Sequence, residues 1–174
     1  MSVLEKRYNG STIPRPPNSQ LMKWAHPPVI KIYEALGSVA DGRIQLSGNS
    51  AKVYSSNGNK FYTVNFDPAS KSIMTNDNGS FYKGYLGYPA IAFLMLIGEL
   101  NYSPSVAEKL KGIAWKDINQ KFKNDFEKTR LYILEGKAIE DRAAIEREVS
   151  AIDEQLKTKS YDFLGPRIQP PEGY

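Results

Sequence analysis

The stretch Gly84–Leu100, GYLGYPAIAFLMLIGEL, decides the fold of this chain because it holds the longest apolar run, from Ala90 to Ile97. A membrane-spanning helix needs about 20 apolar residues, whereas this run ends at Gly98 and Glu99. A proline at its start and a glycine near its end are typical of a helix. Apolar residues on every side indicate a helix that is buried on several faces. The stretch therefore predicts a central core helix rather than a membrane anchor.

Short strands are expected before this helix. The segments RIQLSG, AKVYSS, KFYTVNFD and SIMTND, within residues 43–77, are rich in β-branched and aromatic residues and are separated by turns. Asn57 and Gly58 form a strong hairpin signal because both residues tolerate positive φ. In the strand after this turn, Tyr62 and Phe66 face one way and Phe61 faces the other. These segments predict an antiparallel sheet of three or four strands.

Further helices are expected both before and after the strand segments in the sequence. Two prolines followed by apolar residues predict a short helix within residues 27–39, with Gly37 at its end. In NYSPSVAEKLKGI, Ser103 is the expected N-cap of another helix. Residues 114–136 predict one amphipathic helix with lysines on its solvent face.

The last predicted helix covers residues 138–157 and has a narrow apolar stripe. Its members, at alternating steps of four and three, are Ile145, Val149, Ile152 and Leu156. This spacing predicts a seam like that of a coiled coil.

Together these elements predict an α+β fold, an antiparallel three- to four-stranded sheet packed on helices with a long C-terminal helix. The expected organisation is an extended proline-rich arm (1–28), an α+β core domain (29–134), a C-terminal amphipathic helix (135–160) and a proline-rich tail (161–174).

Composition excludes several kinds of site. The 174 residues include no cysteine, which rules out disulfides and cysteine-ligated metals, and a single histidine, His26, which rules out histidine dyads. No glycine-rich turn has the spacing of a phosphate-binding loop or a dinucleotide fingerprint. The acidic residues are spread among lysines, as on a solvated helix face. We therefore expect no enzyme, no metal and no cofactor. No secretory signal is recognisable at the start, so a cytoplasmic location is expected.

Lysines interleaved with tyrosines are the strongest functional signal. The net charge is +4, and residues 1–66 alone carry +5. Rings that stack on bases beside cations that neutralise phosphates are typical of single-stranded nucleic-acid binding. The alternative for each tyrosine is a strand residue with one buried side, and for each helix lysine an ordinary solvated surface. The candidate nucleic-acid-binding residues are Lys52, Tyr54, Lys60, Tyr62, Lys83, Tyr85, Lys109, Lys111, Lys116, Lys121 and Lys123.

The segment FYTVNFDPASKSIMTNDNGSFYKGYLGYPAIAFLMLIG, residues 61–98, resembles a SWIM-type ββα zinc finger. In that pattern, two ligand pairs are held by two strands and the start of a helix. Here the pairs fall on Ile73 and Thr75, and on Ala90 and Ala92, none of which binds a metal. The resemblance implies a metal-free module for recognising DNA or protein.

Three functions follow from these patterns. The first is a non-catalytic nucleic-acid-binding module or an accessory subunit in DNA transactions. The second is a protein–protein adaptor or homo-oligomer that uses the seam Ile145–Leu156 and the proline-rich termini. The third and least supported is an enzyme, which would need a deep pocket lined by converging acids with tyrosine or serine. No membrane partner is expected.

Overall fold

The structure, a computed structural model, describes residues 23–172. The helices are α1 (Ile30–Ala40), α2 (Tyr88–Leu96), α3 (Pro104–Glu108), α4 (Trp115–Lys121), α5 (Phe126–Glu135) and α6 (Ile139–Thr158), with a π-helix, η2 (Gly79–Lys83), ahead of α2. The strands are β1 (Ile44–Ser47), β2 (Ser50–Tyr54), β3 (Phe61–Asp67), β4 (Ser72–Thr75) and β5 (Asp162–Phe163). The α+β class and the long C-terminal helix are confirmed. Most of the predicted arm, residues 1–22, lies outside the described residues.

The sheet has five strands in the order β1-β2-β3-β4-β5, rather than three or four. The first four form the predicted antiparallel meander. The fifth strand lies in the predicted tail and pairs with β4 in parallel, where the Leu164 N–H donates to the Ile73 carbonyl at 3.1 Å. A strand of two residues has no periodic pattern, so the sequence gives no sign of it.

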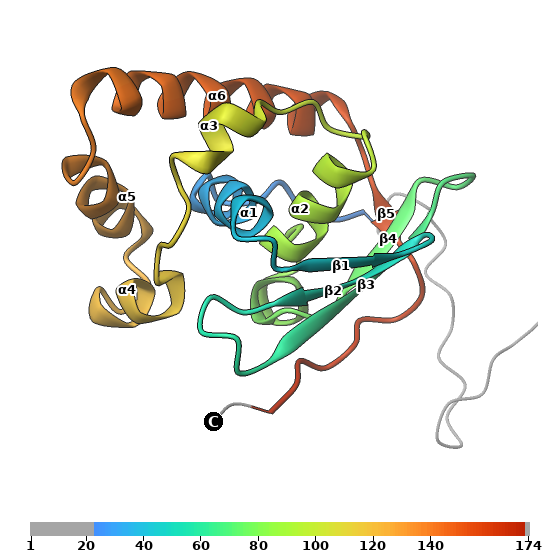
Figure 1. The fold of residues 1–174 in the computed structure, drawn as a ribbon. Coiled ribbons are helices and arrows are strands. Elements are labelled where there is room, and N and C mark those ends of the chain that lie inside the picture. Colours follow the sequence, from blue (N-terminus) through green and yellow to red (C-terminus); the bar gives the residue numbers. More distant parts are fainter. Residues whose placement is uncertain (1–22, 173–174) are drawn as a thin grey trace, which may run out of the picture.

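Three layers build the body of the protein (Figure 1). The sheet forms the first layer, α1 and α2 the second, and α3 and α6 the third, while α4 and α5 lie at one end. Helix α2 contacts both the sheet and its neighbour α1, and every residue from Pro89 to Met95 is buried. The predicted core helix is confirmed. No helix within residues 23–172 combines the length and apolarity that crossing a membrane requires.

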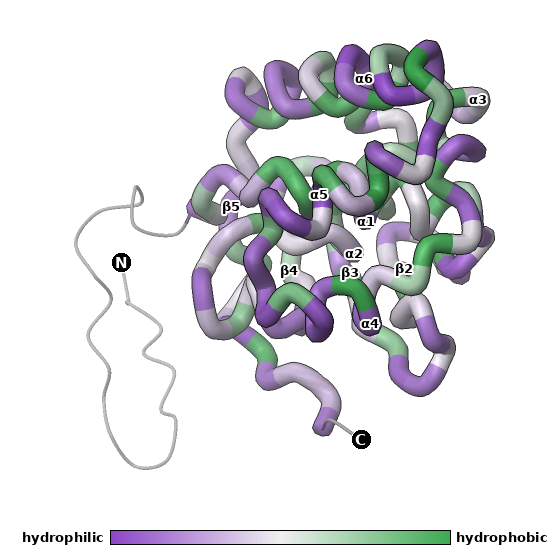
Figure 2. The backbone as a smooth tube through the Cα atoms, turned by 90° about the vertical axis from the view of Figure 1, so that its left-hand side faces the viewer, coloured by the Kyte–Doolittle hydropathy of each residue, from purple (hydrophilic) through white to green (hydrophobic). Residues whose placement is uncertain are grey.

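Helix α6 packs its apolar stripe onto α1 and α3. Hydrophobic residues recur along α6 between hydrophilic ones in Figure 2. The four stripe residues are all buried in the core of the chain, namely Ile145, Val149, Ile152 and Leu156. The adaptor hypothesis assigned this seam to a partner protein, but α1 and α3 of the same chain cover it.

Gly37 lies inside α1 rather than at its end, which corrects the sequence prediction. The indole of Trp115 on α4 packs against this position, and a Cβ on Gly37 would lie 2.7 Å from Trp115 Nε1. The glycine is therefore needed for the close approach of α4 to α1, not for ending the helix.

Residues 114–136 form two helices, α4 and α5, where the sequence predicted one. The chain turns at Lys123 and Asn124, whose φ angles are 51° and 61°. Asp125 then caps α5 by accepting a hydrogen bond from the Lys128 N–H at 3.2 Å. The apolar spacing continues across this turn, which explains why the pattern looked like one helix.

The four positions compared with zinc ligands are all buried. Ile73 and Thr75 lie on β4, and Ala90 and Ala92 lie on α2. The order strand, strand, helix agrees with the pattern of the resemblance, but η2 lies between β4 and α2. The relationship to SWIM modules stays a prediction.

Candidate functional site

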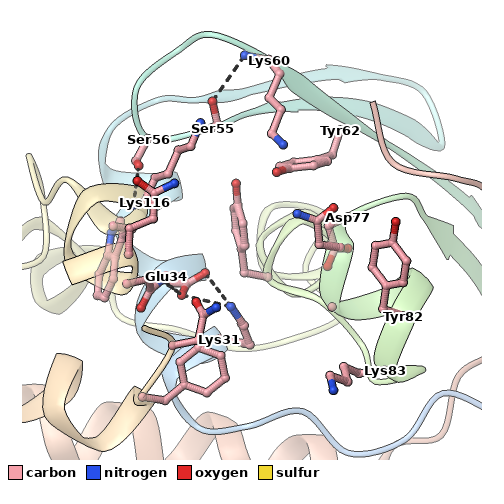
Figure 3. A pocket seen from close by; sticks show the side chains of 18 of the residues that line it. Lys31, Glu34, Ser55, Ser56, Lys60, Tyr62, Asp77, Tyr82, Lys83 and Lys116 are labelled. Carbon is pink, nitrogen blue, oxygen red and sulfur yellow. Dashed lines mark hydrogen bonds and ion pairs between the residues drawn. The ribbon is translucent and has the colours of Figure 1, made fainter. Parts of the chain in front are cut away.

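A cavity of about 760 Å³ opens where α1, the β2–β3 hairpin, η2 and α4 meet (Figure 3). In Figure 3 Lys60 and Tyr62 extend toward its open centre from the hairpin and Lys31 from α1, while Asp77 lies in the wall between β4 and η2. The volume is within the range of about 300–1,000 Å³ that is usual for small-molecule pockets.

The lining of the cavity is rich in positive charge. Its cationic side chains are Lys31, Arg43, Lys60, Lys83 and Lys116. Its acidic side chains are Glu34 and Asp77. Both acids are engaged inside the protein, so the surface offered to a ligand has an excess of positive charge.

Lys31 and Glu34 form a buried ion pair on α1, with Lys31 Nζ 3.1 Å from Glu34 Oε1. The same carboxylate oxygen accepts a hydrogen bond from Asn119 Nδ2 at 2.9 Å, which links α1 to α4. Burial is the largest single effect and would lower the pKa of Lys31, but Glu34, Tyr85 and Asp77 together outweigh it and the pKa is raised. Lys31 therefore stays charged in the wall of the cavity.

Asp77 is a buried acid whose oxygens are held by three donors. Its Oδ1 accepts from Thr75 Oγ1 at 3.0 Å and from Ser80 Oγ at 2.7 Å, and its Oδ2 accepts from the Ser80 N–H at 3.1 Å. A Cβ on Gly87 would overlap this carboxylate. Burial raises the pKa of Asp77 although these donors and Lys31 act against it. Asp77 thus fixes the turn that leads from β4 into η2.

Tyrosine side chains are part of the cavity lining. The Tyr62 and Tyr88 rings meet edge to face with centroids 6.2 Å apart. Tyr85 packs against Gly79, where a Cβ would overlap its ring. Burial raises the pKa of Tyr62 to about 12 and also raises that of Tyr85 and Tyr88. All three phenols are therefore neutral at pH 7.

Lys60 and Lys116 are anchored on consecutive residues of the β2–β3 hairpin. The Ser55 N–H donates to the Lys60 carbonyl at 2.9 Å, and the Lys116 N–H donates to Ser56 Oγ at 3.0 Å. Burial and the neighbouring Lys116 charge lower the pKa of Lys60. The hairpin thus brings two cations to the same corner of the cavity.

The cavity collects five of the eleven residues predicted from the sequence: Lys60, Tyr62, Lys83, Tyr85 and Lys116. They come from β3 and the turn before it, from η2 and the turn after it, and from α4. The structure therefore joins three sequence segments into one site.

Lys52 and Tyr54 lie apart from the cavity on the other face of the sheet. They are joined there by Phe61, whose ring centroid is 5.7 Å from that of Tyr54 and 4.9 Å from Lys52 Nζ. Because side chains alternate along a strand, Tyr62 turns inward and Phe61 outward. Lys52 and Tyr54 therefore lie on a different face of the sheet from Tyr62.

The lysines near α3 and α4 other than Lys116 also lie outside the cavity lining. Lys109 pairs with Asp141 at 2.6 Å, and Lys111 pairs with Glu108 at 3.2 Å. Lys121 Nζ lies 4.4 Å from the centroid of the Tyr132 ring. These residues, with Lys123 at the turn between α4 and α5, do not form one basic helix face.

Sequence reasoning missed several residues of the cavity, namely Lys31, Glu34, Arg43, Asp77 and Trp115. One signal was available, because Lys31 and Glu34 are opposite charges three residues apart within an otherwise apolar helix. Asp77 gave no such signal, since acids are common in turns.

A family model described as "Uncharacterised conserved protein UCP014422" matches residues 24–162. The match covers most of the chain, and the chain belongs to this family. It includes every residue that lines the cavity. No curated protein and no solved structure matches the chain.

Proposed function

We propose that this protein is a non-catalytic nucleic-acid-binding module that receives part of a single strand in the cavity between α1, the β2–β3 hairpin, η2 and α4. The observation that carries the proposal is the convergence of lysines and tyrosines from four separate segments on one cavity. The cytoplasmic location expected from the sequence belongs to the same proposal.

The chemistry of the lining supports a nucleotide as the ligand. The partly exposed ring of Tyr85 offers a surface to a base, and stacking of one base on one ring contributes about 1–3 kcal/mol. Tyr62, with 7% of the residue exposed, belongs to the wall of the cavity. Lys83 and Lys116 supply positive charge for phosphates. Neither lysine has an ion-pair partner among residues 23–172, so binding would not have to break an internal salt bridge.

The size of the cavity limits what enters it. A volume of about 760 Å³ is typical of a pocket for a small molecule. A duplex does not fit into such a pocket, because proteins read its grooves with an extended surface such as a helix or a β-ribbon. A single strand or a strand end is the form of nucleic acid that fits such a pocket.

Fluorescence anisotropy with single- and double-stranded DNA and RNA tests the proposal, at about 50 and 200 mM salt. Single strands should bind more tightly than duplexes, and more tightly at the lower salt concentration. The variant Lys83→Gln/Lys116→Gln should bind roughly tenfold more weakly, corresponding to about 1.4 kcal/mol. Absence of binding at low salt would refute the proposal.

A matched control is Lys109→Gln/Lys111→Gln, which removes the same charge outside the cavity. Since both lysines are already paired with acids, we expect less than about a twofold loss of affinity. A second control, Phe61→Ala, tests the open face of the sheet. An equal or larger loss in this variant would place the binding surface on that face instead.

The adaptor hypothesis keeps one supporting observation. Leu131, Tyr132 and Ile139 are large apolar side chains exposed near the junction of α5 and α6, with Ile139 76% exposed. Exposed apolar side chains that gather into one contiguous patch mark protein interaction sites, whereas single ones are normal on a surface. Light scattering of the full chain tests for self-association, and a monomer at all concentrations would argue against a homo-oligomer through this region.

A further inference from the structure

We propose that Lys60 and Lys116, with the hydroxyl of Ser56, form a subsite for a phosphomonoester, the terminal phosphate of a nucleotide. The inference deepens the proposed function and rests on it. The nucleotide can be the end of a single strand or a free mononucleotide, because both present the same chemical group.

The β2–β3 hairpin builds this corner of the cavity. Ser55 and Ser56 are neighbours in the chain, and each bonds to the backbone of one of the two lysines. The Lys60 N–H donates to Ser55 Oγ at 3.4 Å, and the Lys116 N–H donates to Ser56 Oγ at 3.0 Å. Figure 3 shows Lys60 and Lys116 on adjoining walls of the cavity. Two residues far apart in sequence are thereby fixed beside each other.

The corner lacks a counter-ion. Within residues 23–172, neither Lys60 nor Lys116 forms a salt bridge. The two acids of the cavity are engaged elsewhere, Glu34 with Lys31 and Asn119, and Asp77 with Thr75 and Ser80. Two like charges in a partly buried corner repel each other, and a bound anion would relieve this repulsion.

Lys60 is unusually enclosed for a lysine of a surface hairpin, with 9% of the residue exposed. Lysine is almost never this buried without a partner. Its ammonium covers one face of the Tyr62 ring, 5.5 Å from the centroid, while Tyr82 and Tyr85 line the same cavity. An anion at Lys60 and an aromatic group of the same ligand would therefore both find partners in the cavity. That combination of groups is a phosphorylated nucleoside.

A terminal phosphate fits the corner better than a phosphodiester within a chain. A phosphomonoester carries about −1.5 to −2 charges at pH 7, which matches two lysines, whereas a diester carries one. A diester also needs space for the chain to leave in two directions, and the enclosed position of Lys60 leaves little room for this. Ser56 can add a hydrogen bond, because its hydroxyl oxygen accepts from Lys116 while its proton stays available.

Matched oligonucleotides test the subsite. Single strands with 5′-phosphate, 5′-hydroxyl, 3′-phosphate and 3′-hydroxyl ends, each labelled at the opposite end, are titrated by anisotropy. Nucleoside monophosphates and the corresponding nucleosides serve as competitors and as direct ligands in calorimetry. We expect one phosphorylated end to bind about tenfold more tightly than its hydroxyl form, and monophosphates to compete where nucleosides do not.

Variants assign the preference to residues. Lys60→Met/Lys116→Met should abolish the preference for the phosphorylated end, and Lys109→Gln/Lys111→Gln should keep it. Lys116→Met alone serves as a second variant, because Lys116 is less buried, and thermal denaturation checks folding of each.

The outcomes separate the two proposals. Equal affinity for phosphorylated and hydroxyl ends, with tight binding of both, would overturn the subsite and leave the proposed function intact. Binding of mononucleotides without binding of any strand would overturn the proposed function and support the subsite for free nucleotides. No binding of either class would overturn both.

Discussion

Gly87, at the start of α2, lies directly against the carboxylate of Asp77 in the turn after β4, and a side chain at position 87 would overlap it. The φ of Gly87 is −75°, which any residue adopts. The glycine is therefore required for space and not for its backbone freedom. Since Asp77 holds Ser80 and Thr75, this contact sets the position of the whole η2 wall of the cavity.

The first prediction concerns this contact. Gly87→Ala should lower the free energy of unfolding by more than about 2 kcal/mol, because overpacking displaces a buried carboxylate and its hydrogen bonds. Gly136→Ala is the control, since its φ is also negative and a Cβ there would meet no atom closer than 3.5 Å. It should be neutral or stabilise by up to about 1 kcal/mol. Urea denaturation measures both, and similar values for the two variants would contradict the packing argument.

The second prediction concerns the ion pair of Lys31 and Glu34, whose side chains are 13% and 4% exposed. Lys31→Met and Glu34→Gln should each destabilise the fold by roughly 2–4 kcal/mol, because each leaves a buried charge without its partner. In a double-mutant cycle, the coupling energy should exceed about 1 kcal/mol. The exposed pair of Lys111 and Glu108 should give less than about 0.5 kcal/mol. Additive effects at Lys31 and Glu34 would show that the pair does not act as a unit.

The third prediction is that the charge of Lys60 lowers the free energy of unfolding. The pKa of its folded form lies below the ordinary value of 10.5, so the unfolded chain binds its proton more strongly. The cost is fully present below the folded pKa and disappears as the pH rises toward 10.5. Lys60→Met should therefore stabilise the protein by roughly 0.5–1 kcal/mol at pH 7, with the difference shrinking as the pH rises through the folded pKa toward 10.5.

The same variant should lose the preference for a phosphorylated end. Chemical denaturation at several pH values, combined with the anisotropy titration, measures both properties. If Lys60→Met is less stable than the parent protein at pH 7, Lys60 stabilises the fold, and the prediction that its buried charge lowers stability is wrong.

The fourth prediction concerns Asp153 on α6, which accepts from His26 at 2.7 Å and pairs with Lys157 at 3.2 Å. Burial would raise the pKa of Asp153, but these two partners outweigh it and hold the pKa below 3.8. The stabilisation from a lowered carboxyl pKa is present above 3.8 and is lost as the pH falls through the folded pKa.

Asp153→Asn should therefore destabilise the protein by about 0.5–1.5 kcal/mol at pH 7, with a smaller difference below about pH 4. Glu154→Gln is the control, because Glu154 also pairs with Lys157 but its side chain is 66% exposed. Thermal unfolding of both variants at pH 7 and pH 3 tests this prediction. If Asp153→Asn destabilises the protein equally at both pH values, the charge of Asp153 does not contribute to stability.

The sequence was sufficient for features that depend on neighbouring residues. The four-stranded meander, α1, the core helix α2 and the long α6 were all predictable, because alternation, helical spacing and turn residues act within short segments. The sequence also pointed to five residues that line the cavity, as lysines and tyrosines close together in the chain. They are Lys60, Tyr62, Lys83, Tyr85 and Lys116.

The grouping of these residues depended on contacts between distant segments. Phe61 and Tyr62 are neighbours in the chain, yet they face opposite sides of the sheet, and only the packing of α2 decides which one turns inward. The turn at Lys123 and Asn124 separates α4 from α5 without interrupting the apolar spacing, so the sequence pattern does not show it. Strand β5 forms only because the end of α6 brings the chain back beside β4.

The sequence by itself determined the meander, the helices α1, α2 and α6, and the interleaving of basic and aromatic residues along the chain. The tertiary structure alone decided that Lys60 and Lys116 share one corner, because this follows from the contact of the β2–β3 hairpin with α4. It also decided that Asp77 and Glu34 are engaged inside the protein. The physical reason is that the charge of a site depends on which groups meet in space, and a linear pattern shows only which groups are present.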